Sequence, residues 1–148
     1  DGSRSSAQTG FEALMIVLEK HNVGLKGKKV AVFGQGELVG KPISYWLERE
    51  GAEVFRIRSK TENPAEISKE ADIIISGVGK PGLVKRDMIK DRAVVIDFGY
   101  GKDKDGKMKG DIDFEPVSVK ASLITPVPGG MGPILIAAVL KNLILLNS

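Results

Sequence analysis

The fold of this chain is constrained most by the stretch from Lys28 to Pro42, KKVAVFGQGELVGKP, in which a short apolar run leads into a series of glycines. The run at 30–33, Val-Ala-Val-Phe, is typical of a strand that is buried on both faces. Gly34, Gly36 and Gly40 follow it, and a helical pattern comes next. A strand that ends in a glycine turn at a helix N-terminus can bind an anion, because backbone N–H groups and the helix dipole point at it. We therefore expect the diphosphate of a nucleotide to bind at this turn.

The glycine pattern matches no nucleotide-binding fingerprint completely. The third glycine falls one residue later than in G-x-G-x-x-G, and the interval from Gly36 to Gly40 is too short for a phosphate-binding P-loop. Pro42 also stands where a P-loop has the Ser or Thr that binds magnesium. A glycine turn with a purely structural role is the alternative. The strand before the turn and the helix after it favour nucleotide binding.

Composition argues against several other classes of protein. The 148 residues suit one domain, and 42% of them are hydrophobic and 28% charged. The net charge of +3 is the sum of well-mixed charges, so no nucleic-acid partner is expected. The chain has no cysteine and a single histidine, His21, which argues against disulfides and against a metal site. The most apolar run, 134–146, is too short to span a bilayer, so we expect a cytoplasmic protein with no membrane contact.

Apolar runs alternate with helical patterns along the chain and predict an α/β fold. Strands are expected at residues 30–33, 52–57, 72–75, 93–97 and 122–124. Helices are expected at residues 9–21, 43–50, 64–70, 87–89, 114–120 and 134–146. Residues 1–7 are expected to be loose, with Thr9 as the cap of the first helix. The short connections predict a Rossmann-like, doubly wound, mostly parallel sheet in three layers.

Two segments outside this alternation have their own signatures. Residues 101–110, GKDKDGKMKG, predict a hairpin around Asp105-Gly106. A calcium loop is the alternative for the acidic residues there, but their spacing lacks the closing glutamate. Residues 126–133, PVPGGMGP, are too rigid for a linker, and Pro133 suits the first position of the last helix.

Ligands of such sheets bind beyond the carboxyl ends of the strands. Glycine recurs at several of these ends, as a flat cofactor that lies against the backbone requires. The candidate cofactor-binding residues there are Gly34, Gln35, Gly36, Gly40, Lys41, Pro42, Arg58, Ser59, Lys60, Thr61, Gly77, Val78, Gly79, Lys80, Pro81, Asp97 and Gly99.

The end of the second strand bears on the choice between NAD and NADP. An NAD site has Asp or Glu at this position, where it accepts hydrogen bonds from the ribose hydroxyls. Glu53 lies at the start of the strand, whereas Arg58, Ser59 and Lys60 follow its end. Cations and a hydroxyl suit a 2′-phosphate, so we expect NADP, with NAD as the second choice and a solvated basic strand end as the alternative.

The sequence contains no evident pair of base and nucleophile. Asp97, Asp111 and Asp113 are candidate bases, but Asp at a strand end or in a turn is more often a cap or turn residue. We therefore interpret the chain as a cofactor holder that lacks catalytic residues of its own.

Several motifs together resemble the C-terminal, nucleotide-binding half of the bifunctional methylenetetrahydrofolate dehydrogenase/methenyltetrahydrofolate cyclohydrolase family. They follow one another at family-like spacing and cover nearly all of the chain from Leu25 to Pro133. The matching segments are LKGKKVAVFG (25–34), LVGKP (38–42), RSKT (58–61), ADIIISGVGKPG (71–82), DMIK-x-x-AVVIDFG (87–99), GDIDF (110–114) and ITPVPGGMGP (124–133). The resemblance adds Val39, Gly130 and Gly132 to the expected cofactor site.

The resemblance implies a dehydrogenase that passes hydride from 5,10-methylenetetrahydrofolate to NADP, with cyclohydrolase activity in the full-length enzyme. It also implies a role in one-carbon metabolism and purine biosynthesis, a homodimer, and a folate cleft between two domains. Family members carry their catalytic tyrosine and lysine in the N-terminal half, which is absent here. Residues 1–24 would then be a tail and linking helix, 25–133 the NAD(P)-binding domain, and 134–148 a helix that packs on the missing folate domain.

The chain departs from the family pattern at several positions. Gln35 stands where the family usually has an arginine that contacts the 2′-phosphate, and Arg58, where histidine is common, is expected to supply the lost charge. Our main hypothesis is the cofactor domain of a longer enzyme, and the absence of Met at Asp1 fits a fragment. The alternative is a stand-alone, non-catalytic nucleotide-binding or regulatory module. A reading frame that continues upstream into a Tyr-x-x-x-Lys-bearing half would favour the enzyme.

Overall fold

A five-stranded parallel sheet forms the centre of the computed structural model, which describes residues 2–36 and 40–126. The strands lie in the order β2-β1-β3-β4-β7. Their bounds are β1 Lys29–Phe33, β2 Glu53–Ile57, β3 Ile73–Ser76, β4 Val94–Asp97 and β7 Leu123–Ile124. The chain moves outward from β1 to β2 and then crosses to the other side of β1, so the winding direction reverses between β1 and β3. The predicted doubly wound α/β fold is confirmed.

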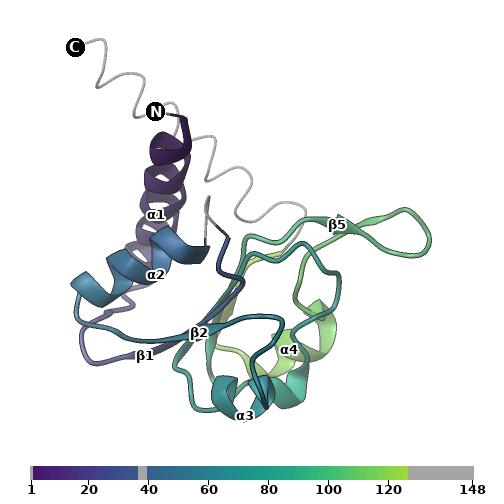
Figure 1. Cartoon of the computed structure of the whole chain (residues 1–148). Coiled ribbons are helices and arrows are strands. Elements are labelled where there is room, and N and C mark those ends of the chain that lie inside the picture. Colours follow the sequence, from purple (N-terminus) through teal and green to yellow (C-terminus); the bar gives the residue numbers. More distant parts are fainter. Residues whose placement is uncertain (1, 37–39, 127–148) are drawn as a thin grey trace.

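Helices cover both faces of the sheet and complete the three predicted layers (Figure 1). One face carries α1 (Gly2–Lys20) and α2 (Gly40–Arg49), and the other carries α3 (Pro64–Ser68), the short 3-10 helix η1 (Arg86–Met88) and α4 (Phe114–Lys120). Successive residues of β1 alternate between the two cores: Val30 and Val32 pack in the core that contains α1, and Ala31 and Phe33 in the core that contains α4. Because both faces are covered, the central strands consist almost entirely of apolar residues.

The first helix begins earlier than the sequence predicts. It runs from Gly2, so the prediction of a loose segment over residues 1–7 is wrong for residues 2–7. Thr9 lies inside this helix and is buried, and it therefore does not cap its start. Leu14 and Leu18 pack against the sheet and fix the C-terminal half of the helix. Extension of a helix that already exists needs only one further residue per hydrogen bond, which explains why polar residues continue it.

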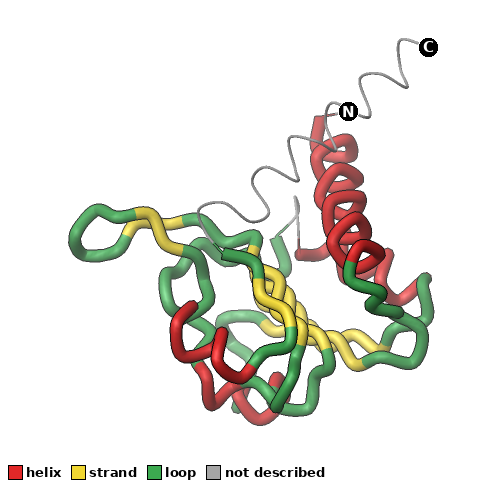
Figure 2. The backbone as a smooth tube through the Cα atoms, turned by 180° about the vertical axis from the view of Figure 1, so that it is seen from behind, coloured by secondary structure: helices red, strands yellow, loops and turns green. Residues whose placement is uncertain are grey.

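The hairpin extends away from the sheet (Figure 2), and its predicted turn is confirmed. Strands β5 (Gly101–Lys102) and β6 (Met108–Lys109) pair in antiparallel orientation. The carboxylate of Asp103 accepts hydrogen bonds from the backbone amides of Asp105 and Lys107, both at 2.9 Å, which closes the turn. Within the part of the chain that the structure describes, no helix has the length and apolar character needed to cross a membrane. The predicted segment 126–133 lies almost entirely, and the predicted last helix wholly, outside the described residues.

Candidate nucleotide-binding site

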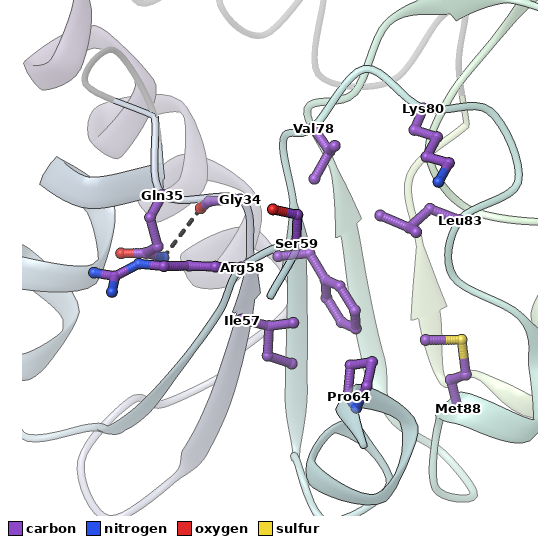
Figure 3. A pocket seen from close by; sticks show the side chains of 11 residues that line it. Gly34, Gln35, Ile57, Arg58, Ser59, Pro64, Val78, Lys80, Leu83 and Met88 are labelled. Atoms are coloured by element: carbon purple, nitrogen blue, oxygen red, sulfur yellow. Dashed lines mark hydrogen bonds between the residues drawn. The ribbon is translucent and has the colours of Figure 1, made fainter. Parts of the chain in front are cut away.

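A cavity of about 430 Å³ opens where β1, β2 and β3 end at the same edge of the sheet (Figure 3). Phe33, the last residue of β1, pairs with Ile57 of β2 and with Ser76 of β3, so the three strands end level with one another. The winding of the sheet reverses between β1 and β3, which is the place where sheets of this type bind ligands. The cavity is lined by Phe33, Gly34, Gln35, Ile57, Arg58, Ser59, Pro64, Val78, Lys80, Leu83 and Met88.

The turn after β1 requires glycine at two positions. Gly34 has a φ of +91°, and a Cβ there would lie 3.1 Å from both the carbonyl oxygen of Gly77 and Cγ2 of Val78. A Cβ on Gly40 would lie only 1.8 Å from the carbonyl oxygen of Gly34, so the first turn of α2 packs directly on the end of β1. Gly36 differs from both, because a Cβ there would meet open space. The packing of the described residues therefore does not require glycine here, and the space beside the Gly36 backbone is open to a ligand.

Gln35 is held to the start of α2. Its Nε2 donates to the carbonyl oxygen of Gly34 at 3.0 Å and to Oγ of Ser44 at 3.2 Å. The Ser44 hydroxyl in turn donates to the carbonyl oxygen of Gly40 at 2.7 Å. The buried Oε1 of Gln35 has no donor among the described residues. The side chain thus braces the glycine turn against the helix and leaves one acceptor without a protein partner.

The segment after β2 is a closed turn that carries the basic residues. The backbone amide of Arg58 donates to Oγ1 of Thr61 at 2.8 Å, and the amide of Thr61 donates to the carbonyl oxygen of Arg58 at 3.0 Å. Arg58 and Ser59 line the cavity, whereas Lys60 and Thr61 do not. Figure 3 shows the end of Arg58 on the same side of the cavity as Gln35, with Lys80 on the far side. Glu53 pairs with Lys29 at the opposite end of β2, so its carboxylate cannot take part in the site.

The loop after β3 contributes side chains to the cavity, while its amides are bound elsewhere. Val78 and Lys80 line the cavity. The backbone amides of Val78, Gly79 and Lys80 all donate to the carboxylate of Asp111, at 2.7, 2.9 and 2.8 Å. The amide of Gly77 donates to the carbonyl oxygen of Phe33 at 3.0 Å. These N–H groups are therefore not free to bind a phosphate or a ribose.

Asp97, at the end of β4, faces the protein and does not reach the cavity. It is 2% exposed, and its carboxylate accepts hydrogen bonds from the amides of Gly99 (2.7 Å), Asp111 (3.2 Å) and Ile112 (3.1 Å). Burial raises the pKa of Asp97 from 3.8 to about 6, although the three hydrogen bonds act in the opposite direction. Neither Asp97 nor Gly99 lines the cavity, and a ligand contact of these two residues stays a prediction.

Comparison with known proteins places this geometry in a family. The sequence profile of the NAD(P)-binding domain of tetrahydrofolate dehydrogenase/cyclohydrolase matches residues 9–148. The chain belongs to this family. The bifunctional protein FolD of Staphylococcus aureus (strain Newman) is 44% identical over 132 residues, which are 89% of this chain and 46% of that protein. The chain thus spans about half the length of the curated relatives that it matches.

Solved structures agree with the family assignment. The bifunctional enzyme FolD from Campylobacter jejuni superposes with a TM-score of 0.86 at 38% identity, over 90% of this chain and 47% of the other. The Trypanosoma brucei enzyme, whose structure contains NADP and an inhibitor, superposes with a TM-score of 0.84 at 37% identity, over 90% and 48%. The predicted resemblance is confirmed.

The structure brings one part of the predicted site together in the cavity. Gly34, Gln35, Arg58, Ser59, Val78 and Lys80 line it. Gly36, Gly40, Lys41 and Pro42 lie next to it at the glycine turn and the start of α2, and the amide of Lys41 donates to the carbonyl oxygen of Gly36 at 3.0 Å. The loop after β3 contains three more of the predicted residues, Gly77, Gly79 and Pro81. This loop lies against the start of β5, because a Cβ on Gly101 would lie 3.1 Å from Cδ of Pro81. Val39, Gly130 and Gly132 lie outside the described residues.

Sequence reasoning missed the apolar lining of the cavity. These residues are Phe33, Ile57, Pro64, Leu83 and Met88. Phe33 and Ile57 are the last residues of their strands, and apolar residues at predicted strand ends could have indicated them as part of the cavity wall. An apolar wall with a few polar groups at its rim is typical of pockets that bind small molecules, and it suits a flat aromatic base. The glycine turn beside it offers the close backbone approach that a diphosphate needs, so the described residues fit a dinucleotide cofactor.

Proposed function

We propose that the cavity binds the adenosine part of NADP and that the glycine turn at 34–36 receives its diphosphate. The apolar residues Phe33, Ile57 and Leu83 suit the adenine ring, and the exposed backbone at Gly36 suits the diphosphate. Arg58 and Ser59 offer a cation and a hydroxyl to a 2′-phosphate.

The observation that carries the choice of NADP is the chemistry at the end of β2. Arg58 and Ser59 line the cavity there, and the carboxylate of Glu53 is at the other end of the strand. NAD sites rely on an acidic residue at the carboxyl end of this strand, which accepts hydrogen bonds from the ribose. Gln35 cannot supply a positive charge, so Arg58 is the residue on which discrimination depends.

We further propose that the domain serves a longer enzyme that oxidises 5,10-methylenetetrahydrofolate and hydrolyses the methenyl product. Bound NADP would supply the acceptor for the hydride, and this chain would hold and orient it. The folate would bind in a cleft that is completed by a domain outside this chain. By the same family resemblance we propose a homodimeric enzyme that provides one-carbon units for purine biosynthesis.

The test is a titration of the chain with NADP and NAD by isothermal calorimetry. We expect tighter binding of NADP, and Arg58→Ala should weaken it by about 1–3 kcal/mol while NAD binding stays unchanged. The matched control is Arg56→Ala, which removes the same charge two residues earlier, within β2. Arg56 is paired with Glu48 and does not line the cavity, so the control should alter neither affinity. Equal affinity for the two nucleotides, or an unchanged NADP affinity in Arg58→Ala, would reject the proposal.

A further inference from the structure

A buried carboxylate lies behind the cavity and takes no part in the proposed binding of the nucleotide. Asp111 is 0% exposed and belongs to the GDIDF segment that precedes α4. Its Oδ2 accepts hydrogen bonds from Oγ of Ser76 and from the amide of Val78, both at 2.7 Å. Its Oδ1 accepts from the amides of Gly79 at 2.9 Å and Lys80 at 2.8 Å. Four donors, one from the last residue of β3 and three from the loop after it, thus converge on a single side chain.

Three consecutive amides that point at one anion form the kind of concave site that proteins use for phosphate. Here the protein fills that site with its own carboxylate. A hydrogen bond to a charged acceptor is stronger than one between neutral groups, and burial strengthens it further. The loop at 77–80 is therefore fixed in one shape, and Val78 and Lys80 are the groups that it presents to the cavity.

The position of Asp111 is itself fixed from β4. The carboxylate of Asp97 accepts hydrogen bonds from the backbone amides of Asp111 at 3.2 Å and Ile112 at 3.1 Å. A Cβ on Gly99 would lie 2.2 Å from both Cγ and Oδ1 of Asp111, so glycine is required for the carboxylate to lie there. The backbone of Asp111 also pairs with Val84, whose amide donates to its carbonyl oxygen at 2.8 Å.

We propose that Asp111 is a positioning residue for the nucleotide site, and that its buried carboxylate holds the loop at 77–80 in the shape that places Val78 and Lys80 against the bound cofactor. The proposal rests on the proposed binding of a nucleotide in this cavity. It gives the GDIDF segment a role in ligand binding although Asp111 itself does not touch the ligand. Lys80 lies on the far side of the cavity from Arg58 (Figure 3), so we expect the loop to face a part of the ligand that NADP and NAD share, and Asp111 to act on the affinity for both.

The experiment compares Asp111→Asn with the matched control Asp113→Asn in the 148-residue chain. Asp113 lies two residues away, and its carboxylate makes no capping hydrogen bond to α4. Amide hydrogen exchange is measured by NMR in the absence of ligand, and the affinities for NADP and NAD are measured by calorimetry. In Asp111→Asn we expect the amides of residues 78–80 to lose their protection and both affinities to fall by about tenfold. The control should leave exchange and affinities unchanged.

The outcomes separate this proposal from the proposed function. A folded Asp111→Asn variant that keeps both affinities, or a control that weakens binding equally, would overturn the role of Asp111. If the wild-type chain binds neither nucleotide, the proposed function fails and this role with it, whatever the exchange data show for the loop. Should the Asp111→Asn variant fail to fold, Ser76→Ala is measured in its place, because this change removes only one of the four donors to the Asp111 carboxylate. Faster exchange at Val78 with weaker binding of both nucleotides would support the proposal, and no change in either would overturn it.

Discussion

The junction between β1 and α2 offers the sharpest test of the packing that builds the site. A Cβ on Gly40 would lie 1.8 Å from the carbonyl oxygen of Gly34 and 2.6 Å from its carbonyl carbon. Real Cβ atoms essentially never approach another heavy atom more closely than 3.0 Å. In Gly40→Ala the start of α2 and the end of β1 must therefore separate by about 1.2 Å. Both neighbours are backbone, so no side chain can rotate away to make room.

The magnitude follows from the nature of that contact. Overpacking of a tight site costs about 1–3 kcal/mol, and a clash with backbone belongs at the upper end of this range. We expect Gly40→Ala to lower the free energy of unfolding by about 3 kcal/mol, which corresponds to a fall in Tm of about 6–12 °C. Gly36→Ala is the control, because its Cβ would meet no atom of the described part of the chain within 4 Å, and we expect it to change the free energy of unfolding by no more than about 0.5 kcal/mol.

The assay is urea unfolding followed by tryptophan fluorescence. Trp46 is the only tryptophan of the chain and lies on α2, with its ring 5.1 Å from that of Phe11 on α1. It therefore reports directly on the helix that must move. If Gly40→Ala proves as stable as Gly36→Ala, the close approach of α2 to the end of β1 does not exist in solution, and the description of the glycine turn is incorrect.

Two further predictions concern the buried carboxylates. The pKa of Asp97 is about 6 in the folded chain and 3.8 in the unfolded chain. The protonated carboxyl therefore stabilises the fold fully below pH 3.8, and this contribution is lost as the pH rises through about 6. The stability of the wild type minus that of Asp97→Asn should therefore fall by up to about 3 kcal/mol between pH 4 and pH 7 in urea titrations, and a difference that does not vary with pH would contradict this. Gly99→Ala would place a Cβ 2.2 Å from the Asp111 carboxylate, so we expect a loss of about 3 kcal/mol and faster amide exchange at residues 78–80. Wild-type stability in this variant would refute the contact.

Elements with strong local signals were predictable from the sequence. The strands β1, β3 and β4 are apolar runs that end at glycine or aspartate, and α4 begins and ends at Phe114 and Lys120, as predicted. The start of α1 was not predictable, because serine-rich residues 2–7 carry no helical signal of their own and extend a helix that is stabilised by packing further along.

In the candidate site too, the residues with a local signal were predictable and those placed by long-range contacts were not. The glycine turn and the basic residues after β2 are short segments whose chemistry is visible in the sequence. The role of Asp111 is not, because its partners lie 31 to 35 residues earlier in the sequence. The pairing of β3 with β4, the hydrogen bonds to Asp97 and the pairing with Val84 bring them together. The same holds for the hydrogen bonds of Asp97, whose buried carboxylate accepts from the amides of Asp111 and Ile112, 14 and 15 residues later. Long-range hydrogen bonds, which leave no periodic pattern, account for most of what the sequence did not reveal.

The central claim is that the bare backbone after Phe33 leaves room for a diphosphate, and Gly36→Ala tests it most directly. No atom of the described residues lies within 4 Å of a Cβ at this position, so the variant should unfold at the same urea concentration as the wild type. Its added methyl group would nevertheless stand in the path of the nucleotide, and we predict that calorimetry will show NADP binding weakened by about tenfold or more. A Gly36→Ala variant that folds normally and binds NADP with wild-type affinity would contradict the account.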